Sequence, residues 1–318
     1  MSDAITLGSV TKRYGSLTAV DGVDLCIPEG SLCGFLGPNG AGKSTTIRMI
    51  MSIIYPDDGT ISVLGGSALD RKDGIGYLPE ERGLYRKMRV GEFLKYIARL
   101  KGIGSVGLTQ RVDQWLERME LPGVQRKRCQ ELSKGMQQKI QFIASVIHDP
   151  ELIILDEPFS GLDPVNARLL GRTVREIHES GRTIIFSTHV LHQAEQICDR
   201  VIMINRGRIV LDGSMPEIRR QFDPRSIRIK ATGNLDSLAQ RLEEHPQIRS
   251  LETQSEEGMI ELRMEHEEET PEPRIPSSVL DCFNQQDGIC TVELRQPTLD
   301  DIFVELVGST IEDLDGDS

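Results

Sequence analysis

The 318-residue sequence lacks any long hydrophobic run. Its longest apolar stretches, ELIIL, RTIIF and VIMI, fall far short of the roughly 18 residues that a membrane-spanning helix needs. The N-terminal segment MSDAITLGSV has no basic-then-apolar signal pattern. We therefore expect a chain that stays in the cytosol and has no membrane span of its own.

Paired cysteines are also missing. No two cysteines form a CxxC pair, and no Cys/His group has the spacing of a zinc site. Such a pattern favours free thiols in a reducing cytosol over disulfides or a structural metal. The six residues concerned are Cys26, Cys33, Cys129, Cys198, Cys282 and Cys290.

Basic residues are scarce in the last third of the chain. Up to Arg225 there are 30 Lys and Arg against 27 Asp and Glu, whereas from Ser226 onward there are 7 against 22. Binding to nucleic-acid phosphates needs a basic surface. We therefore expect no nucleic-acid partner, least of all for the acidic C-terminal part.

The same change in charge predicts a domain boundary near residues 222–226, where Pro224 also interrupts regular structure. We accordingly expect an α/β domain in residues 1–224, an accessory domain in residues 225–308 and an acidic, disordered tail in residues 309–318.

What the first part does contain is a series of short apolar runs without alternation, separated by helical patterns. Runs of this kind are typical of the buried parallel strands of an α/β sheet. Ligands of such sheets bind at the carboxyl ends of the strands. The residues that follow each run are therefore the candidates for function.

The first run, SLCGFLG, continues as Gly37-Pro38-Asn39-Gly40-Ala41-Gly42-Lys43-Ser44. These residues match the phosphate loop GxxxxGK[ST], and they lie between an apolar strand and a helix, as that loop requires. Backbone N–H groups would wrap the phosphates, Lys43 would bind the β- and γ-phosphates, and Ser44 would ligate Mg²⁺. The alternative is a glycine-rich turn that happens to hold a lysine, which the matching flanks disfavour.

The second run, ELIILDEP, ends in the adjacent carboxylates Asp156 and Glu157. Burying such a pair is unfavourable unless a cation balances it, and Mg²⁺ beside a triphosphate would do so. Asp156 would then hold the metal through water or Ser44, and Glu157 would polarise the attacking water. The alternative is a strand-end turn with two solvated acids.

The third run, RTIIFSTH, ends in His189. Most lone histidines are structural, and we expect this of the histidines at positions 148, 178, 245 and 266. His189 differs because it closes a buried strand at the same predicted edge as Lys43 and Glu157, where it could contact the γ-phosphate and orient the water. A metal pair made of His189 and His192 is the weaker alternative.

Taken together, residues Ile5–Phe222 resemble the nucleotide-binding subunit of an ATP-binding-cassette (ABC) transporter. The motifs occur in the order that the family has. The resemblance implies the following assignments: adenine stacking by Tyr14; phosphate binding by Gly37–Thr45; the signature motif in LSKGM; the metal-binding and catalytic acids in Asp156 and Glu157; the D-loop in Ser160–Asp163; the switch histidine in His189.

The resemblance also explains a glycine in the segment QELSKGMQQKIQF, which reads as a helix capped by Ser133. Gly135 lies in its first turn, where glycine costs about 1 kcal/mol relative to alanine. In the family, two cassettes form a head-to-tail dimer, and the signature motif of one contacts the ATP of the other. Ser133 and the Gly135 N–H would make that contact. Lys134 and Met136 replace the usual Gly and Gln.

A second departure is Glu80, in GIGYLPEERGLY, where the family usually has a glutamine that senses Mg²⁺ and couples to the membrane partner. A carboxylate there could still ligate Mg²⁺, so the expected metal ligands are Ser44, Asp156 and Glu80. The segment YLPEERGLY and the form of the signature motif resemble the ABC-2 class of exporters.

The last third reads as strand, helix, two strands, helix and strand, followed by a helix in TLDDIFVELVG. This order suggests a small ferredoxin-like α+β module. It resembles the C-terminal appendage of ABC-2 exporter ATPases, and a structural role and a regulatory role both stay open. We expect the strand pair to turn around Gly258 and EHEEETPEPRIP to be a solvated loop.

The leading hypothesis is an ATPase subunit that requires ATP and Mg²⁺, acts as a homodimer or paired subunit, and drives a separate permease from the cytoplasmic face of the membrane. A soluble ABC protein acting on ribosomes or DNA is the first alternative, but those typically carry two cassettes or a long coiled-coil insertion. A kinase or GTPase is the second, but the chain has no NKxD motif.

Overall fold

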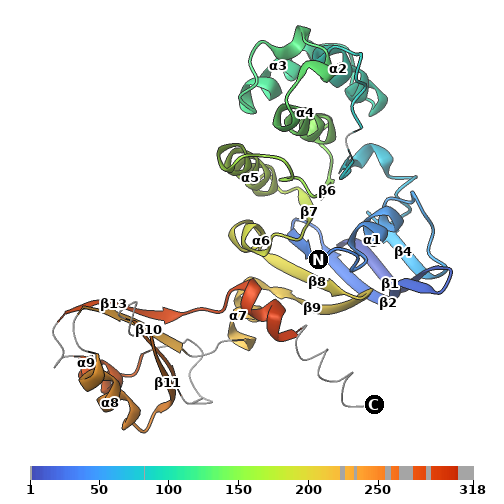
Figure 1. Cartoon of the computed structure of the whole chain (residues 1–318). Coiled ribbons are helices and arrows are strands. Elements are labelled where there is room, and N and C mark those ends of the chain that lie inside the picture. Colours follow the sequence, from blue (N-terminus) through green and yellow to red (C-terminus); the bar gives the residue numbers. More distant parts are fainter. Residues whose placement is uncertain are drawn as a thin grey trace. The chain divides into compact units, whose positions relative to one another are not determined.

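A computed structural model of the chain (Figure 1) describes residues 2–81, 83–222, 226–232, 235–254, 259–264, 275–283 and 288–306. The chain forms two units, Met1–Met215 and Pro216–Ser318. The boundary that we predicted between residues 224 and 225 adjoins residues outside the described part, and it stays a prediction.

A six-stranded sheet forms the centre of the first unit, in the order β5-β6-β7-β3-β8-β9. The first five strands pair in parallel, and β9 pairs antiparallel with β8. Because β3, β6 and β7 are buried along their whole length, their sequences show no alternation. The strands are β3 (Leu32–Leu36), β5 (Ile75–Leu78), β6 (Leu152–Asp156), β7 (Thr183–Thr188), β8 (Arg200–Asn205) and β9 (Arg208–Ser214).

The three apolar runs singled out from the sequence are neighbours in this sheet, in the order β6-β7-β3. Leu36 pairs with Thr188, and Asp156 pairs with Ser187. The carboxyl ends of the three strands therefore meet at one edge, as the sequence predicted.

A second, three-stranded antiparallel sheet has the order β2-β1-β4. Its strands are β1 (Asp3–Tyr14), β2 (Leu17–Pro28) and β4 (Asp58–Val63). Side chains from both sheets and from helix α1 (Lys43–Ile50) form one buried apolar cluster, which includes Ile5, Phe35 and Ile47. This cluster fixes α1, and with it the loop before α1, against the central sheet.

Three helices of the first unit pack on one another: α2 (Val90–Leu100), α3 (Leu108–Arg118) and α4 (Lys134–Val146). Figure 1 shows them together at the end of the unit opposite β8 and β9. Short 3-10 turns occur at Lys72–Gly74, Val124–Arg126 and Cys129–Glu131. The remaining helices are α5 (Pro164–Glu179) and α6 (Leu191–Ile197).

Helix α7 (Met215–Gln221) starts at the last residue of the first unit, and the second unit contains a four-stranded antiparallel sheet in the order β11-β12-β10-β13. Numbered within the unit, that order is 2-3-1-4, so the predicted ferredoxin-like arrangement is confirmed. Helices α8 and α9 share one apolar core with the sheet. The elements are β10 (Ser226–Ala231), α8 (Asp236–Glu243), β11 (Ile248–Gln254), β12 (Met259–Met264), α9 (Ser277–Phe283) and β13 (Ile289–Arg295).

The predicted closing helix is present at residues 299–306, with Leu299 and Ile302 buried. Three other predictions fall outside the described residues: the turn around Gly258, most of the charged loop at residues 265–276, and the tail at residues 309–318. The six cysteines are free, as expected.

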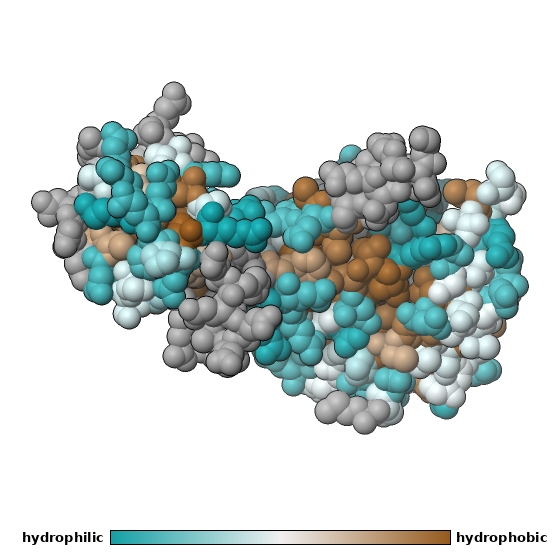
Figure 2. Space-filling model, turned by 90° about the horizontal axis from the view of Figure 1, so that it is seen from below, coloured by the Kyte–Doolittle hydropathy of each residue, from teal (hydrophilic) through white to brown (hydrophobic). Residues whose placement is uncertain are grey.

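Hydrophobic and hydrophilic residues share the surface seen in Figure 2. Exposed large apolar side chains occur in both units, among them Tyr14, Tyr85 and Val304. Among the described residues, no helix has both the length and the hydrophobicity that crossing a bilayer requires.

Candidate functional site

The loop after β3 adopts a backbone that requires glycine at two positions. Gly37 and Gly42 have φ values of 152° and 110°. A Cβ on Gly37 would lie 2.2 Å from the Ile204 carbonyl oxygen, and one on Gly42 would lie 2.6 Å from that of Ala19. The loop therefore contacts the neighbouring backbone closely at both positions, and only glycine fits this backbone conformation.

Lys43 begins α1, and its ammonium group folds back into this loop. Its Nζ donates to the carbonyl oxygens of Gly37 at 2.7 Å and Pro38 at 3.1 Å. Burial lowers the pKa of Lys43, against the opposing effect of nearby carboxylates. No side chain of the described residues caps α1. A helix N-terminus without a side-chain cap, with a buried ammonium beside it, suits an anion such as phosphate.

Asp156, at the end of β6, is only 2% exposed. The Ser187 hydroxyl on β7 donates to its Oδ1. Burial raises the pKa of Asp156, and the Ser187 hydrogen bond partly opposes that effect. A buried carboxylate held in this way is unfavourable by itself, so the residue fits a site that gains a cation.

Glu157 adopts a left-handed backbone, with φ of 49°. Its N–H donates to both the hydroxyl and the carbonyl oxygen of Ser187, each at 3.2 Å. Its Oε1 lies 2.9 Å from Nδ1 of His189. A strained backbone at a non-glycine residue is often part of a functional site, because the surrounding contacts must maintain it.

Glu80 follows β5 and reaches the same edge of the sheet. Leu78 of β5 pairs with Leu155 of β6, so Glu80 and Glu157 each stand two residues beyond this pair along their chains. Burial is the main cause of the lowered pKa of Lys43 and of the raised pKa of Asp156; the Glu80 carboxylate opposes the first shift and adds to the second. The structure therefore brings Lys43, Asp156, Glu157, His189 and Glu80 together.

Sequence reasoning missed the part that Ser187 has in this arrangement. The residue is fully buried and joins β7 to both acidic residues at the end of β6. A serine inside an otherwise apolar strand indicated that its hydroxyl has a polar partner. Only the register of β6 and β7 shows which carboxylate that partner is.

Tyr14 and Ser133 make contacts of other kinds. Tyr14, at the end of β1, is 49% exposed and has the Lys12 ammonium 5.7 Å from its ring centroid. Ser133 caps α4 by accepting from Met136 N at 3.3 Å. Among the described residues, no hydrogen bond links Ser133 or Gly135 to the loop before α1.

The described residues hold no group of three or more His, Cys, Asp or Glu side chains that could hold a metal by themselves. His192 Nε2 lies 2.9 Å from Gln196 Nε2, and the alternative of a His189/His192 metal pair stays a prediction. The donor set still fits Mg²⁺, which usually takes only one or two carboxylates and completes its shell with phosphate and water.

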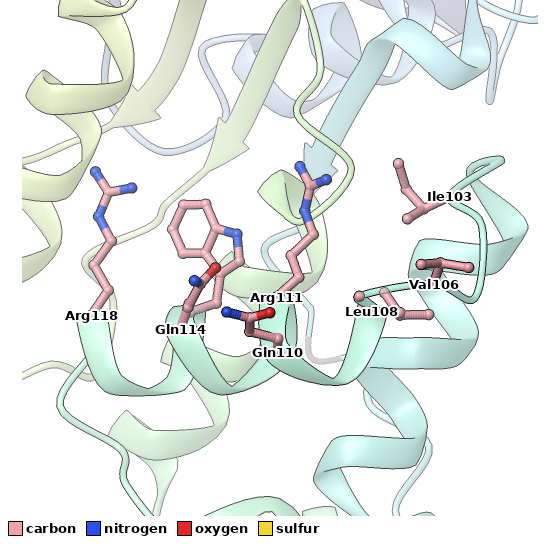
Figure 3. Close-up of a pocket in the computed structure, with 9 residues that line it drawn as sticks. Ile103, Val106, Leu108, Gln110, Arg111, Gln114 and Arg118 are labelled. Atoms are coloured by element: carbon pink, nitrogen blue, oxygen red, sulfur yellow. The ribbon is translucent and has the colours of Figure 1, made fainter.

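A separate depression of about 510 Å³ lies beside α3. Figure 3 shows Arg111 and Arg118 extending from α3 on the same side, with Ile103 and Val106 beyond the end of α3 that carries Leu108. None of the predicted site residues lines it. The candidate site is instead the open carboxyl edge of the sheet.

Comparisons with known proteins identify the family of the chain. Residues 20–160 match the family model for ABC transporters, and residues 213–307 match the C-terminal domain of DrrA1-3-like ATP-binding proteins. The chain is 41% identical to the ABC transporter ATP-binding protein YhaQ of Bacillus subtilis, over 97% of this chain and 100% of that protein.

A second relative is the daunorubicin resistance ATP-binding protein DrrA3 of Streptomyces coeruleorubidus, 31% identical over 96% of each chain. A solved dimeric structure of a bacterial ABC transporter cassette shares the fold, with a TM-score of 0.62 and 24% identity over 66% of this chain and 98% of that one. On this evidence the chain belongs to the ABC transporter ATP-binding subunits, with a DrrA-like C-terminal domain.

Proposed function

We propose that the chain hydrolyses ATP at the carboxyl edge of the central sheet and that this drives a separate permease. The observation that carries the proposal is the contact between Glu157 and His189, 2.9 Å apart, beside the buried Asp156. A carboxylate paired with an imidazole next to a phosphate loop can orient a water molecule for attack on a phosphate.

Each residue has a part in this proposal. The loop Gly37–Thr45 binds the phosphates through its N–H groups, and Lys43 leaves the carbonyls of its own loop to bind them. Glu157 accepts a hydrogen bond, and then the proton, from the attacking water. His189 keeps the Glu157 carboxylate in place. Tyr14 is exposed enough to stack on adenine.

Mg²⁺ would be held by Ser44, Asp156 and Glu80 and would supply charge neutralisation at the phosphates. Ser187 is a positioning residue in this scheme. Its hydroxyl fixes Asp156, and its backbone fixes the amide of Glu157.

The chain is further proposed to act as a dimer in which Ser133 and Gly135 contact the ATP of the opposite subunit. A Cβ on Gly135 would lie 3.5 Å from the Leu162 side chain and 3.7 Å from the Gly161 carbonyl oxygen, which is ordinary contact. The fold of the chain itself therefore does not require glycine here. A requirement from outside the chain, such as close approach of a phosphate to the helix backbone, would explain it.

The permease would bind near the segment that follows Glu80, on the cytoplasmic face of the membrane. Tyr85 in this segment is 53% exposed, and its ring contacts those of Phe93 and Tyr96 with centroids 5.9 and 5.7 Å apart. Such a supported aromatic surface suits a protein partner. The relationship to DrrA3, a resistance protein, supports an exporter.

Hydrolysis and dimerisation are tested together with Glu157→Gln. This variant is expected to bind ATP, to hydrolyse it at least about a hundredfold more slowly, and to accumulate as an ATP-bound dimer. Phosphate release and size-exclusion chromatography with Mg²⁺ and ATP measure these effects. A variant that stays monomeric, or that keeps hydrolysing ATP, contradicts the role of Glu157.

The dimer contact is tested with Gly135→Ala, with Gly104→Ala as the matched control because a Cβ on Gly104 would also meet no obstacle. Gly135→Ala is expected to fold and to bind ATP, but to lose ATP-dependent dimerisation. Co-purification of a membrane protein from detergent extracts tests the permease, and co-purification of ribosomes instead would refute it.

A further inference from the structure

The hairpin that carries Tyr14 contacts the loop before α1. Tyr14 of β1 pairs with Leu17 of β2, and Ala19 lies two residues further along β2. The backbone of Ala19 approaches Gly42 so closely that a Cβ on Gly42 would lie 2.6 Å from the Ala19 carbonyl oxygen. This contact ties the hairpin of β1 and β2 to the loop that is proposed to bind the phosphates.

Gly207, in the turn between β8 and β9, joins the same two segments. Its N–H donates to the Ala41 carbonyl oxygen at 2.9 Å, and its carbonyl oxygen accepts from the Asp21 N–H of β2, also at 2.9 Å. Two separate backbone contacts thus hold β2 against the loop before α1. The end of β1, which pairs with β2, is accordingly fixed relative to this loop.

Asp57 holds the end of β1 from a different segment of the chain. It follows α1 and immediately precedes β4. Its N–H donates to the Thr11 carbonyl oxygen at 2.8 Å, and its Oδ2 accepts from the Arg13 N–H at 2.6 Å. Its Oδ1 accepts from Nζ of Lys12 at 2.9 Å. Asp57 therefore contacts all three residues that precede Tyr14.

Lys12 carries this contact to the aromatic ring. Its side chain is only 16% exposed, and its ammonium group lies over the Tyr14 ring, 5.7 Å from the centroid. Hydrogen bonds from the Arg13 amide and then from Lys12 hold the pKa of Asp57 below its usual range, so the carboxylate that anchors the ammonium stays charged. Tyr14 is nevertheless 49% exposed, so its ring is accessible to a planar ligand.

We propose that Lys12 and Asp57 are positioning residues for the nucleobase: Asp57 holds the Lys12 ammonium on one face of Tyr14, and the base stacks on the other face. This inference rests on the proposed function, because it assumes that Tyr14 stacks on adenine. The physical reason is preorganisation. A ring that is fixed before the ligand arrives loses less side-chain entropy on binding than a ring that moves freely.

The test is equilibrium binding of ATP and of inorganic tripolyphosphate to the full chain, each with saturating MgCl₂. Tripolyphosphate has no base, so the ratio of its dissociation constant to that of ATP measures the contribution of the base. Lys12→Met keeps a long side chain without the ammonium group. It is expected to weaken ATP binding about three- to tenfold and to leave tripolyphosphate binding unchanged. Lys12→Arg, which still offers a cation to Asp57 and the ring, should keep the wild-type ratio.

Asp57→Ala should lower the ratio as Lys12→Met does, and Asp24→Ala is its matched control. Asp24 is also an exposed carboxylate that holds β1, because its Oδ1 accepts from the Ser9 N–H at 2.7 Å. Ser9 lies five residues before Tyr14, so Asp24→Ala should keep the wild-type ratio. In turnover, Lys12→Met and Asp57→Ala should raise the KM for ATP and leave kcat unchanged, since the groups that act on the attacking water are untouched.

The outcomes separate this inference from the proposed function. If Tyr14→Ala lowers the ratio but Lys12→Met and Asp57→Ala do not, the proposed function stands and the inference is wrong. Weaker binding of both ligands, or an equal change in Asp24→Ala, also overturns the inference, because either result indicates a general effect of charge or folding. If the wild type binds ATP no more tightly than tripolyphosphate, the proposed stacking of Tyr14 on the base fails, and the inference fails with it.

Discussion

The candidate site of the first unit and the charged cluster around Glu261 in the second unit hold their charged side chains in opposite ways. At the nucleotide edge of the first unit, burial lowers the pKa of Lys43 and raises that of Asp156, so both shifts favour the neutral form. In the second unit, burial raises the pKa of Glu261, but hydrogen bonds from Arg295 and Arg228 outweigh it and lower the pKa overall.

The difference reflects how completely each group is paired. Glu261 lies between two guanidinium groups, 2.7 Å from Arg295 and 3.3 Å from Arg228, and Arg295 also contacts Asp301 at 3.1 Å. These charges satisfy one another within the unit. Among the described residues, Asp156 contacts the Ser187 hydroxyl and Lys43 contacts carbonyl oxygens, and neither pairs with an opposite charge, which suits a site that gains a charged ligand.

Replacing Lys43 is expected to have the largest effect on the candidate site of the first unit. Lys43→Ala is expected to lower ATP affinity about a hundredfold or more, because the only ammonium group in the loop is lost. Equilibrium binding of a fluorescent nucleotide measures this, with Arg99→Ala, an exposed cation on α2, as the control. Tight binding by Lys43→Ala would show that the loop does not depend on this charge.

Ser187→Ala should have the next largest effect. It removes the hydroxyl that fixes Asp156 and accepts from the Glu157 amide, so kcat is expected to fall about ten- to hundredfold. ATP affinity should change much less, because the loop before α1 is untouched. Ser187→Thr keeps the hydroxyl and should recover part of kcat. Equal loss in both variants would indicate a packing defect rather than positioning.

Lowering the pH is expected to destabilise the first unit more than the second, because the first unit contains the buried His148. Burial, followed by the nearby Lys101, lowers its pKa from 6.5 to about 4. Because the unfolded chain binds the proton more readily, stability is full above the unfolded pKa and falls as the pH drops below it. The first unit should lose about 2 kcal/mol between about pH 8 and pH 5.

The only tryptophan, Trp115, lies in the first unit, so urea unfolding followed by its fluorescence measures this loss. His148→Gln should flatten the pH dependence, whereas His192→Gln, at an exposed position, should not. In the second unit the lowered pKa values of Glu261 and Asp301 keep their ion pairs intact over the same range. If His148→Gln lost as much stability at low pH as the wild type does, His148 would not be the cause of the loss.

The smallest effect is expected from the second unit. Glu261→Gln leaves two partly exposed guanidinium groups without their shared partner, so the unit should lose about 1 kcal/mol of stability. Circular dichroism should show the loss, while nucleotide affinity and the Trp115 transition stay unchanged. Glu243→Gln on α8 is the control. A change in nucleotide affinity would indicate that the second unit acts on the site.

Much of this organisation could be predicted from the sequence, because the relevant signals are local. Apolar runs without alternation indicate buried parallel strands, and the residues after them must lie at one edge. The spacing of glycines before Lys43 indicates the phosphate loop, and Ser133 was recognisable as the cap of α4. In the last third, the order of alternating strands and helices was enough to indicate the ferredoxin-like module.

Other features could not be predicted, because they depend on contacts between distant segments. The sequence places Ser187 in a strand, but the pairing of β6 with β7 brings its hydroxyl to Asp156. The left-handed backbone of Glu157 has no local signal either, since glutamate rarely adopts it. The space around Gly135, which shows that its own chain does not require glycine, is visible only once Leu162 is placed.

The sequence by itself therefore determined which residues can do chemistry and at which end of which strand they stand. The tertiary structure decided how their charges are held: Lys43 by carbonyl oxygens and Asp156 by one hydroxyl. The reason is physical. Periodicity and turn chemistry act over a few neighbouring residues, whereas burial and electrostatic balance depend on every group that folding brings near.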